Sequence, residues 1–280
     1  MPWRYHPDLR DDRMPDGNRV TRPTRNCGVR FALAGIAVFG FGAHWVLSPQ
    51  IAQSETVTID AADMKKGHGI TETGLKPVYP TNFKCSPITS LYASWIDVDG
   101  SRRDEIHSGI DAGKFGEWIL APASGTIRAV WKADWQWGAE GALLLKHDRR
   151  DVNLPNGSKH YYSEFDHLSF DEIKDFKVGQ KIERGQKLAR VSRPGEQSSY
   201  LPEVHWEVWE VGSDDLVWRK NRYGAPEWWN ETAQLIDPLY MLGINNPPKD
   251  GQSVLITPFE AGRDFKRFRG FTYILACNPK

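Results

Sequence analysis

Five short strand-like segments follow one another between residues 118 and 212, and turn residues separate them. They are "WILAPASGTIRAVW" (118–131), "GALLLKHD" (141–148), "KHYYSEFDHLS" (159–169), "KVGQKIERGQKLARVS" (177–192) and "VHWEVWEVG" (204–212). The first predicts two strands around a Ser124-Gly125 turn, and the fourth contains two Gly-Gln turns. Regularly spaced strands with glycine turns indicate an antiparallel sheet and not βαβ units. We therefore expect an all-β domain that forms an antiparallel β-sandwich or a barrel-like sheet.

An apolar run near the N-terminus predicts a segment that crosses a membrane. Residues 29–48 carry no charge after Arg30 and have the length that spans a bilayer. Six arginines precede this run: Arg4, Arg10, Arg13, Arg19, Arg22 and Arg25. The positive-inside rule then keeps residues 1–28 in the cytoplasm and sends the rest of the chain across the membrane. We predict an uncleaved signal anchor, with a signal peptide cut near Ala52 and Ser54 as the alternative.

This arrangement places the protein in the cell envelope, anchored in the cytoplasmic membrane with its main domain in the periplasm. Residues 49–85 contain several Gly, Pro and Thr breakers, which predicts a juxtamembrane linker. Residues 86–245 hold the strand-like segments and form the predicted domain. Residues 246–280 follow as a C-terminal extension, in which "FTYILAC" (271–277) predicts one more strand.

Charge and cysteine usage narrow the class of protein further. The chain has 36 Lys and Arg against 36 Asp and Glu, so no basic excess points to nucleic acid as a partner. Cys27 precedes the predicted membrane segment, which leaves Cys85 and Cys277 as the only cysteines in the exported part. Because cysteine pairs commonly oxidise outside the cytoplasm, we predict a Cys85–Cys277 disulfide, with two unpaired buried cysteines as the alternative.

Two histidines and one aspartate form a candidate zinc site. In "HSGID", His107 and Asp111 lie four residues apart, and His205 lies far downstream in a strand-like segment. Two imidazoles and one carboxylate, with a fourth position left to water, are typical of a catalytic zinc ion. Gly109 and the β-branched Ile110 favour a bent or extended segment and not a helix. On this spacing alone, a surface histidine and a turn aspartate are the alternative.

The order of the motifs resembles the LytM/lysostaphin-type zinc metallopeptidases. "HSGID", "FDHLS", "GQKIERGQKLARV", "VHWEV" and "DPLYML" follow one another here, and the family runs H-x-x-x-D, Y-x-H-L, a G-Q…G-Q hairpin and H-x-H-F-E-V. The resemblance covers residues 104–242. It implies an antiparallel β domain with an open groove and one zinc ion per chain. It also implies cleavage of the peptide cross-bridges of cell-wall peptidoglycan, with the peptide stems as the partner.

Residue by residue, the resemblance assigns the zinc ligands to His107, Asp111 and His205. His167 of "FDHLS" matches a histidine that polarises the water or stabilises the oxyanion in relatives. Phe165 stands where the family has a tyrosine, which removes a hydroxyl and keeps an aromatic ring.

The largest departure from the family is Glu203, which replaces the first histidine of H-x-H. Residues i and i+2 of a strand share a face and lie about 6–7 Å apart, so Glu203 can reach a water on a metal held by His205. A carboxylate there is a competent general base, whereas the oxyanion donor would be His167. The alternative is a catalytically silent module that binds peptidoglycan and regulates another wall hydrolase. A third reading is a protease that acts on a secreted protein.

Overall fold

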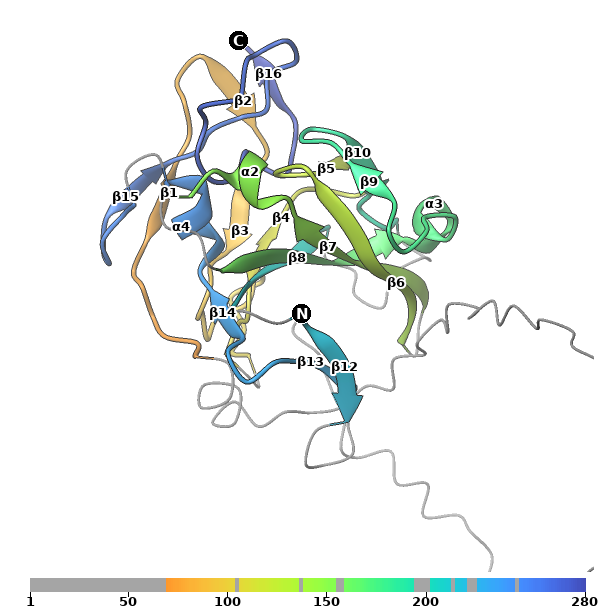
Figure 1. Ribbon diagram of the computed structural model, residues 1–280. Coiled ribbons are helices and arrows are strands. Elements are labelled where there is room, and N and C mark those ends of the chain that lie inside the picture. The colour runs from red at the N-terminus through yellow and green to blue at the C-terminus, as the bar shows by residue number, and fades with distance from the viewer. Residues whose placement is uncertain are drawn as a thin grey trace, which may run out of the picture. The chain divides into compact units, whose positions relative to one another are not determined.

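The computed structural model describes the chain from residue 69 onward, with short gaps (Figure 1). The described ranges are 69–103, 106–135, 138–154, 159–193, 202–212, 215–220, 226–244 and 247–280. All of them lie in one of the chain's two units.

One large antiparallel sheet positions the candidate site. Within the described ranges it has eight strands in the order β3-β4-β11-β8-β7-β6-β9, with β14 also pairing with β11. Their bounds are β3 Ile88–Ser90, β4 Ile110–Ala112, β6 Gly125–Trp135, β7 Gly138–His147, β8 His160–Ser169, β9 Lys181–Ile182, β11 Val204–Val211 and β14 Gln234–Ile236. Every pairing in this sheet is antiparallel, which confirms the antiparallel all-β prediction.

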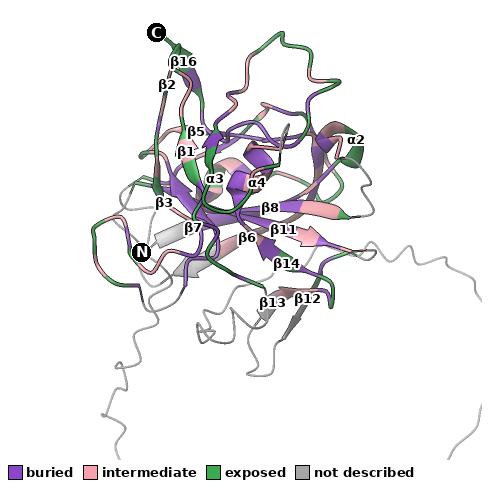
Figure 2. Cartoon of the chain, turned by 90° about the vertical axis from the view of Figure 1, so that its left-hand side faces the viewer, coloured by how far each residue is buried: buried purple, intermediate pink, exposed green. Residues whose placement is uncertain are grey.

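The core forms against β11, which lies inside the sheet between β4 and β8. Val204, Trp206 and Val208 alternate along one face of this strand and are fully buried. The neighbouring strand β8 is also buried over most of its length (purple in Figure 2). The indole of Trp206 stacks on the ring of Phe165 in β8, with the centroids 6.2 Å apart and the planes 4° from parallel. Phe165 therefore keeps the aromatic packing that was expected of it. The opposite face of β11 carries the polar side chains of the site.

Smaller elements complete the described part of the chain. Two further antiparallel pairs are β5 Trp118–Leu120 with β10 Lys187–Arg190, and β12 Val217–Lys220 with β13 Pro226–Trp229. The helices of the described ranges are short: α2 Arg149–Val152, α3 Phe170–Ile173 and α4 Pro238–Leu242. Both strands expected in 118–131 form, but they do not pair with each other. β5 pairs with β10, whereas β6 pairs with β7 and β9.

The segments on either side of the predicted domain pair with each other. β1 Lys76–Val78 runs parallel to β15 Ser253–Leu255, and β2 Phe83–Cys85 runs antiparallel to β16 Cys277–Pro279. The predicted Cys85–Cys277 disulfide is present and joins β2 to β16. Residues 76–85, expected in the linker, thus form strands of the folded unit.

The C-terminal extension also contributes to the core. Phe271, Tyr273, Ile274 and Leu275 are fully buried, so this segment packs against the domain. The strand expected at 271–277 instead begins at Cys277, because only the last residues lie alongside β2.

The predicted signal anchor at 29–48 and the cytoplasmic segment 1–28 lie outside the described residues. In the part of the chain that the structure describes, none of the helices combines the length and apolar character needed to cross a bilayer. The membrane anchor and the periplasmic location stay predictions.

Candidate metal centre

The structure brings His107, Asp111 and His205 together at one point of the large sheet. The Nε2 atom of His107 lies 3.0 Å from Oδ1 of Asp111 and 3.0 Å from Nδ1 of His205. The same Oδ1 atom lies 2.9 Å from Nδ1 of His205. Two ligands of a tetrahedral zinc ion, each about 2.0–2.1 Å from it, are about 3.3 Å apart. The three donor atoms therefore form a nearly regular triangle that fits zinc after a small expansion.

Strand register and one glycine create this convergence. His205 in β11 lies opposite Asp111 in β4, so their side chains share a face. A Cβ atom on Gly109 would meet the carbonyl oxygen of Trp206 at 2.3 Å, which leaves room only for glycine. The "HSGID" segment is extended where it enters β4, as its composition predicts. The tight approach of this segment to β11 sets His107 beside the strand pair.

Each donor atom is oriented by a contact on its far side. His107 donates from Nδ1 to the carbonyl oxygen of Leu91 at 2.8 Å, which leaves Nε2 free to bind a metal. The second carboxylate oxygen of Asp111 accepts a hydrogen bond from Nη2 of Arg103 at 2.7 Å. Nε2 of His205 lies 3.3 Å from Oε1 of Glu207. Such outer contacts fix the tautomer of a ligating histidine and hold a ligating carboxylate in place.

The protonation states of two ligands suit a metal. Burial lowers the pKa of His107, which keeps this imidazole neutral. Burial alone would raise the pKa of Asp111, but the neighbouring His107 and His205 hold it well below the usual range. Burial lowers the pKa of His205, whereas Asp111 and Glu207 outweigh this effect and raise it well above the usual value. A metal at this site would displace that proton, so its binding would be favoured at higher pH.

A β-bulge sets the direction of the His167 side chain. The register between β7 and β8 shifts between Gly141 and Leu143, so that Asp166 and His167 both oppose Ala142. His167 has a φ angle of 61°, in the left-handed region that a non-glycine residue rarely adopts. A residue in this conformation breaks the alternation of side chains along the strand and redirects its own side chain. Sequence alternation alone would place His167 on the face opposite to Asp166.

A buried glutamate holds the redirected imidazole. Nδ1 of His167 donates to Oε2 of Glu140 in β7 at 2.7 Å, and the Glu140 side chain is fully buried. Burial lowers the pKa of His167, but the charge and hydrogen bond of Glu140 outweigh it and raise this pKa above its ordinary value. Glu140 therefore favours the protonated form of His167, which can donate a hydrogen bond from Nε2.

Further carboxylates share the face of the sheet that carries His205. Asp166 lies opposite His205 across the β8–β11 pair, and Glu164 lies opposite Glu207. Burial raises the pKa of Asp166 to about 7. Burial, together with the charge of Glu207, raises the pKa of Glu164 well above its usual value. Sequence reasoning missed both residues, although they alternate on β8 in the way that the acidic residues alternate near His205.

Glu203 lies immediately before β11 and is 1% exposed. Its pKa is raised by burial and by the nearby charge of Asp111, and the charge of His167 acts in the opposite direction. These interactions place its carboxyl group in the electrostatic field of a candidate ligand and of the candidate oxyanion donor. Its role as a general base stays a prediction.

Comparisons with known proteins agree with the motifs. Residues 105–216 match the model of peptidase family M23. A solved structure that the chain resembles is a mutant of the catalytic domain of the prophage-encoded M23 protein EnpA from Enterococcus faecalis. It shows 21% identity over 54% of this chain and 92% of that chain, with a TM-score of 0.33. No curated protein sequence matches the chain.

Two further solved structures are similar to about half of the chain. The catalytic domain of the antimicrobial peptidase lysostaphin from Staphylococcus simulans shows 21% identity over 56% of this chain and 90% of that chain, with a TM-score of 0.31. A zinc-containing peptidase from Vibrio cholerae shows 24% identity over 50% of this chain and 37% of that chain, also with a TM-score of 0.31. At TM-scores this low, the structural likenesses carry no argument of their own. The family model confirms the resemblance to the LytM/lysostaphin-type peptidases of family M23 over residues 105–216.

Proposed function

We propose that the chain is a zinc-dependent endopeptidase that hydrolyses the peptide cross-bridges of cell-wall peptidoglycan. The observation that carries this proposal is the convergence of one ligand atom each from His107, Asp111 and His205, all within 4.8 Å of one another. The match of residues 105–216 to a peptidase family supports the reaction class. Cell-wall peptide as the substrate rests on the resemblance to LytM/lysostaphin-type enzymes.

The protein supplies three functions around the metal position. The two histidines and the aspartate would hold zinc, which when bound polarises a carbonyl group and lowers the pKa of a water molecule to about 7. Glu203 accepts the proton of the attacking water, because a carboxylate beside the site is a competent base. His167 donates a hydrogen bond to the oxygen that becomes negative in the tetrahedral intermediate.

The contact between Glu140 and His167 supports the assignment of His167 as the oxyanion donor and Glu203 as the base. A base must lose its proton at working pH, whereas an oxyanion donor must keep it. Glu140 raises the pKa of His167, which favours the donor role for the imidazole. An ionised carboxylate cannot donate a hydrogen bond, so Glu203 is suited to accept the proton.

A catalytically silent module that binds peptidoglycan and regulates another wall hydrolase is the second candidate. The observation that favours it is the carboxyl group at position 203, where the family has a histidine. Burial raises the pKa of Glu203, and a protonated carboxyl group would be a poor base. The two candidates differ in turnover and not in fold.

The location proposed for this activity is the cell envelope. The apolar run at 29–48 would anchor the protein in the cytoplasmic membrane, with the described unit on the periplasmic side. This part of the proposal rests on the sequence and on the disulfide, which is typical of exported proteins.

The decisive experiment is incubation of purified full-length protein with isolated sacculi, with and without a zinc chelator, followed by mass analysis of the released fragments. An endopeptidase releases muropeptides cut within the peptide bridges, loses this activity with chelator and regains it with added zinc. His205→Ala is the matched inactive variant. Wall binding without fragments would select the silent module. Cleavage of a secreted protein but not of sacculi would select a protease of different substrate class.

A further inference from the structure

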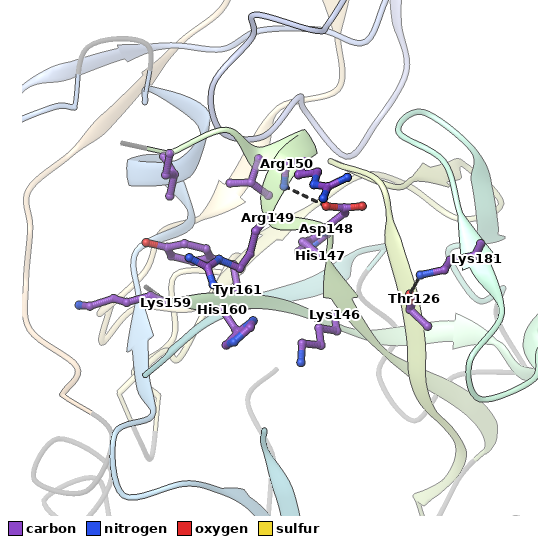
Figure 3. Close-up of a pocket in the computed structure, with 12 residues that line it drawn as sticks. Thr126, Lys146, His147, Asp148, Arg149, Arg150, Lys159, His160, Tyr161 and Lys181 are labelled. Atoms are coloured by element: carbon purple, nitrogen blue, oxygen red, sulfur yellow. Dashed lines mark hydrogen bonds between the residues drawn. The ribbon is translucent and has the colours of Figure 1, made fainter. Parts of the chain in front are cut away.

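A pocket lies at the far end of β7 and β8 from the metal centre (Figure 3). Its volume of about 610 Å³ falls within the range of small-molecule sites. β8 runs from His160 at the pocket to His167 near the metal centre. At a rise of about 3.3 Å per residue, the two sites lie roughly 20 Å apart along the strand. The pocket is therefore separate from the proposed catalytic machinery.

Positive charge dominates the lining of this pocket. Five cationic side chains line it against one acidic side chain: Lys146, Arg149, Arg150, Lys159 and Lys181 against Asp148. They come from β7, α2, the residue just before β8, and β9, which meet around the pocket (Figure 3). Asp148 already serves as the N-cap of α2, where its carboxylate accepts from the backbone N–H of Arg150 at 2.8 Å. The excess is local, because the whole chain has no net charge.

Only part of this positive charge is compensated by neighbouring acids. Lys146 forms an ion pair with Asp215, and Lys159 forms one with Glu210, both outside the lining. Lys181 donates to the hydroxyl of Thr126 at 2.9 Å. Among the described residues, Arg149, Arg150 and Lys181 have no acidic ion-pair partner. Converging cations without counter-charges repel one another, and a bound anion removes this repulsion.

The pKa of His160 is sensitive to the positive charges that line the pocket. Burial lowers the pKa of this imidazole, and the charges of Lys146 and Arg149 lower it further. Asp215 is the neighbouring group that acts in the opposite direction. Figure 3 shows the Arg149 side chain extending from α2 toward the start of β8, where His160 and Tyr161 lie. Three groups from three elements thus share one electropositive corner.

The lining of the same pocket also includes apolar side chains. Val152 is 1% exposed, and Leu154 and Tyr161 are partly buried. The pocket thus combines cationic side chains with apolar surface on which a sugar ring or an aliphatic body can pack. A free inorganic ion would use only the cationic side chains.

We propose that this pocket is an exosite for an oxyanion, a carboxylate or phosphate group carried by a larger envelope ligand, with Arg149, Lys146 and His160 as its contacts. The planar guanidinium of Arg149 offers a pair of parallel donors that matches either group. This assignment goes beyond the peptidase activity and does not depend on zinc. Carboxylate from wall peptides and phosphate from a lipid headgroup or wall polymer share this chemistry, and separate probes distinguish them.

The test follows the imidazole of His160 by NMR in full-length protein, with inorganic phosphate and with glutarate as separate probes. Binding of either anion should raise the pKa of His160 by about one unit, because a nearby negative charge favours the imidazolium. A response to phosphate alone assigns a phosphate source, and a response to glutarate alone assigns a carboxylate source. No shift with either probe overturns the proposal.

Variants make the result specific to the pocket. Arg149→Gln should weaken binding of the responding anion about tenfold, the effect of losing one charged hydrogen-bond donor. Arg149→Lys should retain part of the affinity. Lys249→Gln removes the same charge from an exposed position outside the lining and should leave the affinity unchanged. Equal weakening by Lys249→Gln would show a general charge effect and would reject the site. Sacculus cleavage is measured in parallel, and failure of that activity leaves this result intact.

Discussion

His167 and the buried Glu140 form an imidazole–carboxylate pair across β7 and β8, with Nδ1 of the histidine 2.7 Å from Oε2 of the glutamate. The bulge that carries His167 supplies the direction of the imidazole, and Glu140 supplies its charge state. The pair makes His167 a candidate hydrogen-bond donor over a wider pH range than an isolated histidine would have.

Glu140→Gln tests the charge part of this relationship. The substitution keeps a hydrogen-bond acceptor and removes the charge that raises the pKa of His167. We expect the imidazole to lose its proton about one pH unit lower, so that the alkaline limb of the cleavage profile moves to lower pH. The measurement is kcat/KM against pH, together with the NMR titration of His167. Asp171→Asn, at a fully exposed position, is the control. An unchanged alkaline limb would remove protonated His167 from the mechanism.

Arg103→Gln tests how firmly the aspartate ligand must be held. Arg103 is buried and contacts Asp111 at 2.7 Å and Asp97 at 3.2 Å, and its loss frees the candidate ligand to turn. We expect zinc affinity to fall about 10- to 100-fold, the usual effect of losing an outer contact of a metal site. Competition with a chromophoric chelator measures this affinity, and Arg103→Lys should restore part of it. Zinc binding at wild-type strength in a folded Arg103→Gln protein would contradict the role.

Two substitutions at Glu203 test whether this residue is the general base or belongs to a catalytically silent module. Glu203→Gln should retain about one zinc per chain and lose at least about a hundredfold in kcat, because general-base catalysis contributes that much. Glu203→His restores the family's usual residue and should remain active if the surroundings accept an imidazole. Zinc content and muropeptide release are measured on both. Full activity in the glutamine variant would exclude Glu203 as the base.

Stability should depend on pH through His147, which lies away from the metal centre. Burial lowers the pKa of His147 to about 3, while the unfolded chain keeps the ordinary value of 6.5. The unfolded state then binds the proton first, so this contribution to stability is complete above pH 6.5 and is lost as the pH falls toward 3. The full effect is on the order of 5 kcal/mol.

Urea unfolding of wild type and His147→Gln at pH 7, 5.5 and 4.5 measures this dependence. The difference in unfolding free energy between the two proteins should shrink as the pH falls. A difference that stays constant with pH would mean that His147 does not titrate between the folded and unfolded states.

The strands of the large sheet could be predicted because their signals are local. Glycine turns and alternating runs mark β6, β7, β8 and β11 within a few residues of their observed ends. The grouping of His107, Asp111 and His205 could be predicted from the motif order that resembles the LytM/lysostaphin-type peptidases, whereas their binding of zinc stays a prediction. The distances between these three side chains depend on the register of β4 against β11, which the periodicity of the sequence does not predict.

Other parts of the site depend on contacts that a linear pattern does not contain. Glu140 lies 27 residues before His167, and the bulge that joins them breaks the very alternation from which strand faces are inferred. In the sequence, Arg103 is one of several charged residues near a turn, and nothing there predicts its contact with Asp111. Cys85 in β2 and Cys277 in β16 are 192 residues apart in the sequence. No local pattern indicates a pairing over that separation, so the Gly, Pro and Thr residues of 49–85 predict a linker.

The contacts of His107 bear on how this protein should be dissected. Its imidazole is held by the carbonyl of Leu91, and Asp111 lies in β4, which pairs with β3. Both Leu91 and β3 precede the segment that matches the peptidase family. The buried aromatic residues of 271–275 lie beyond the other end of that segment. A recombinant fragment cut at the family boundaries, 105–216, would carry every candidate ligand but lack the backbone that orients one of them. Expression trials should therefore start no later than β1 and run through β16.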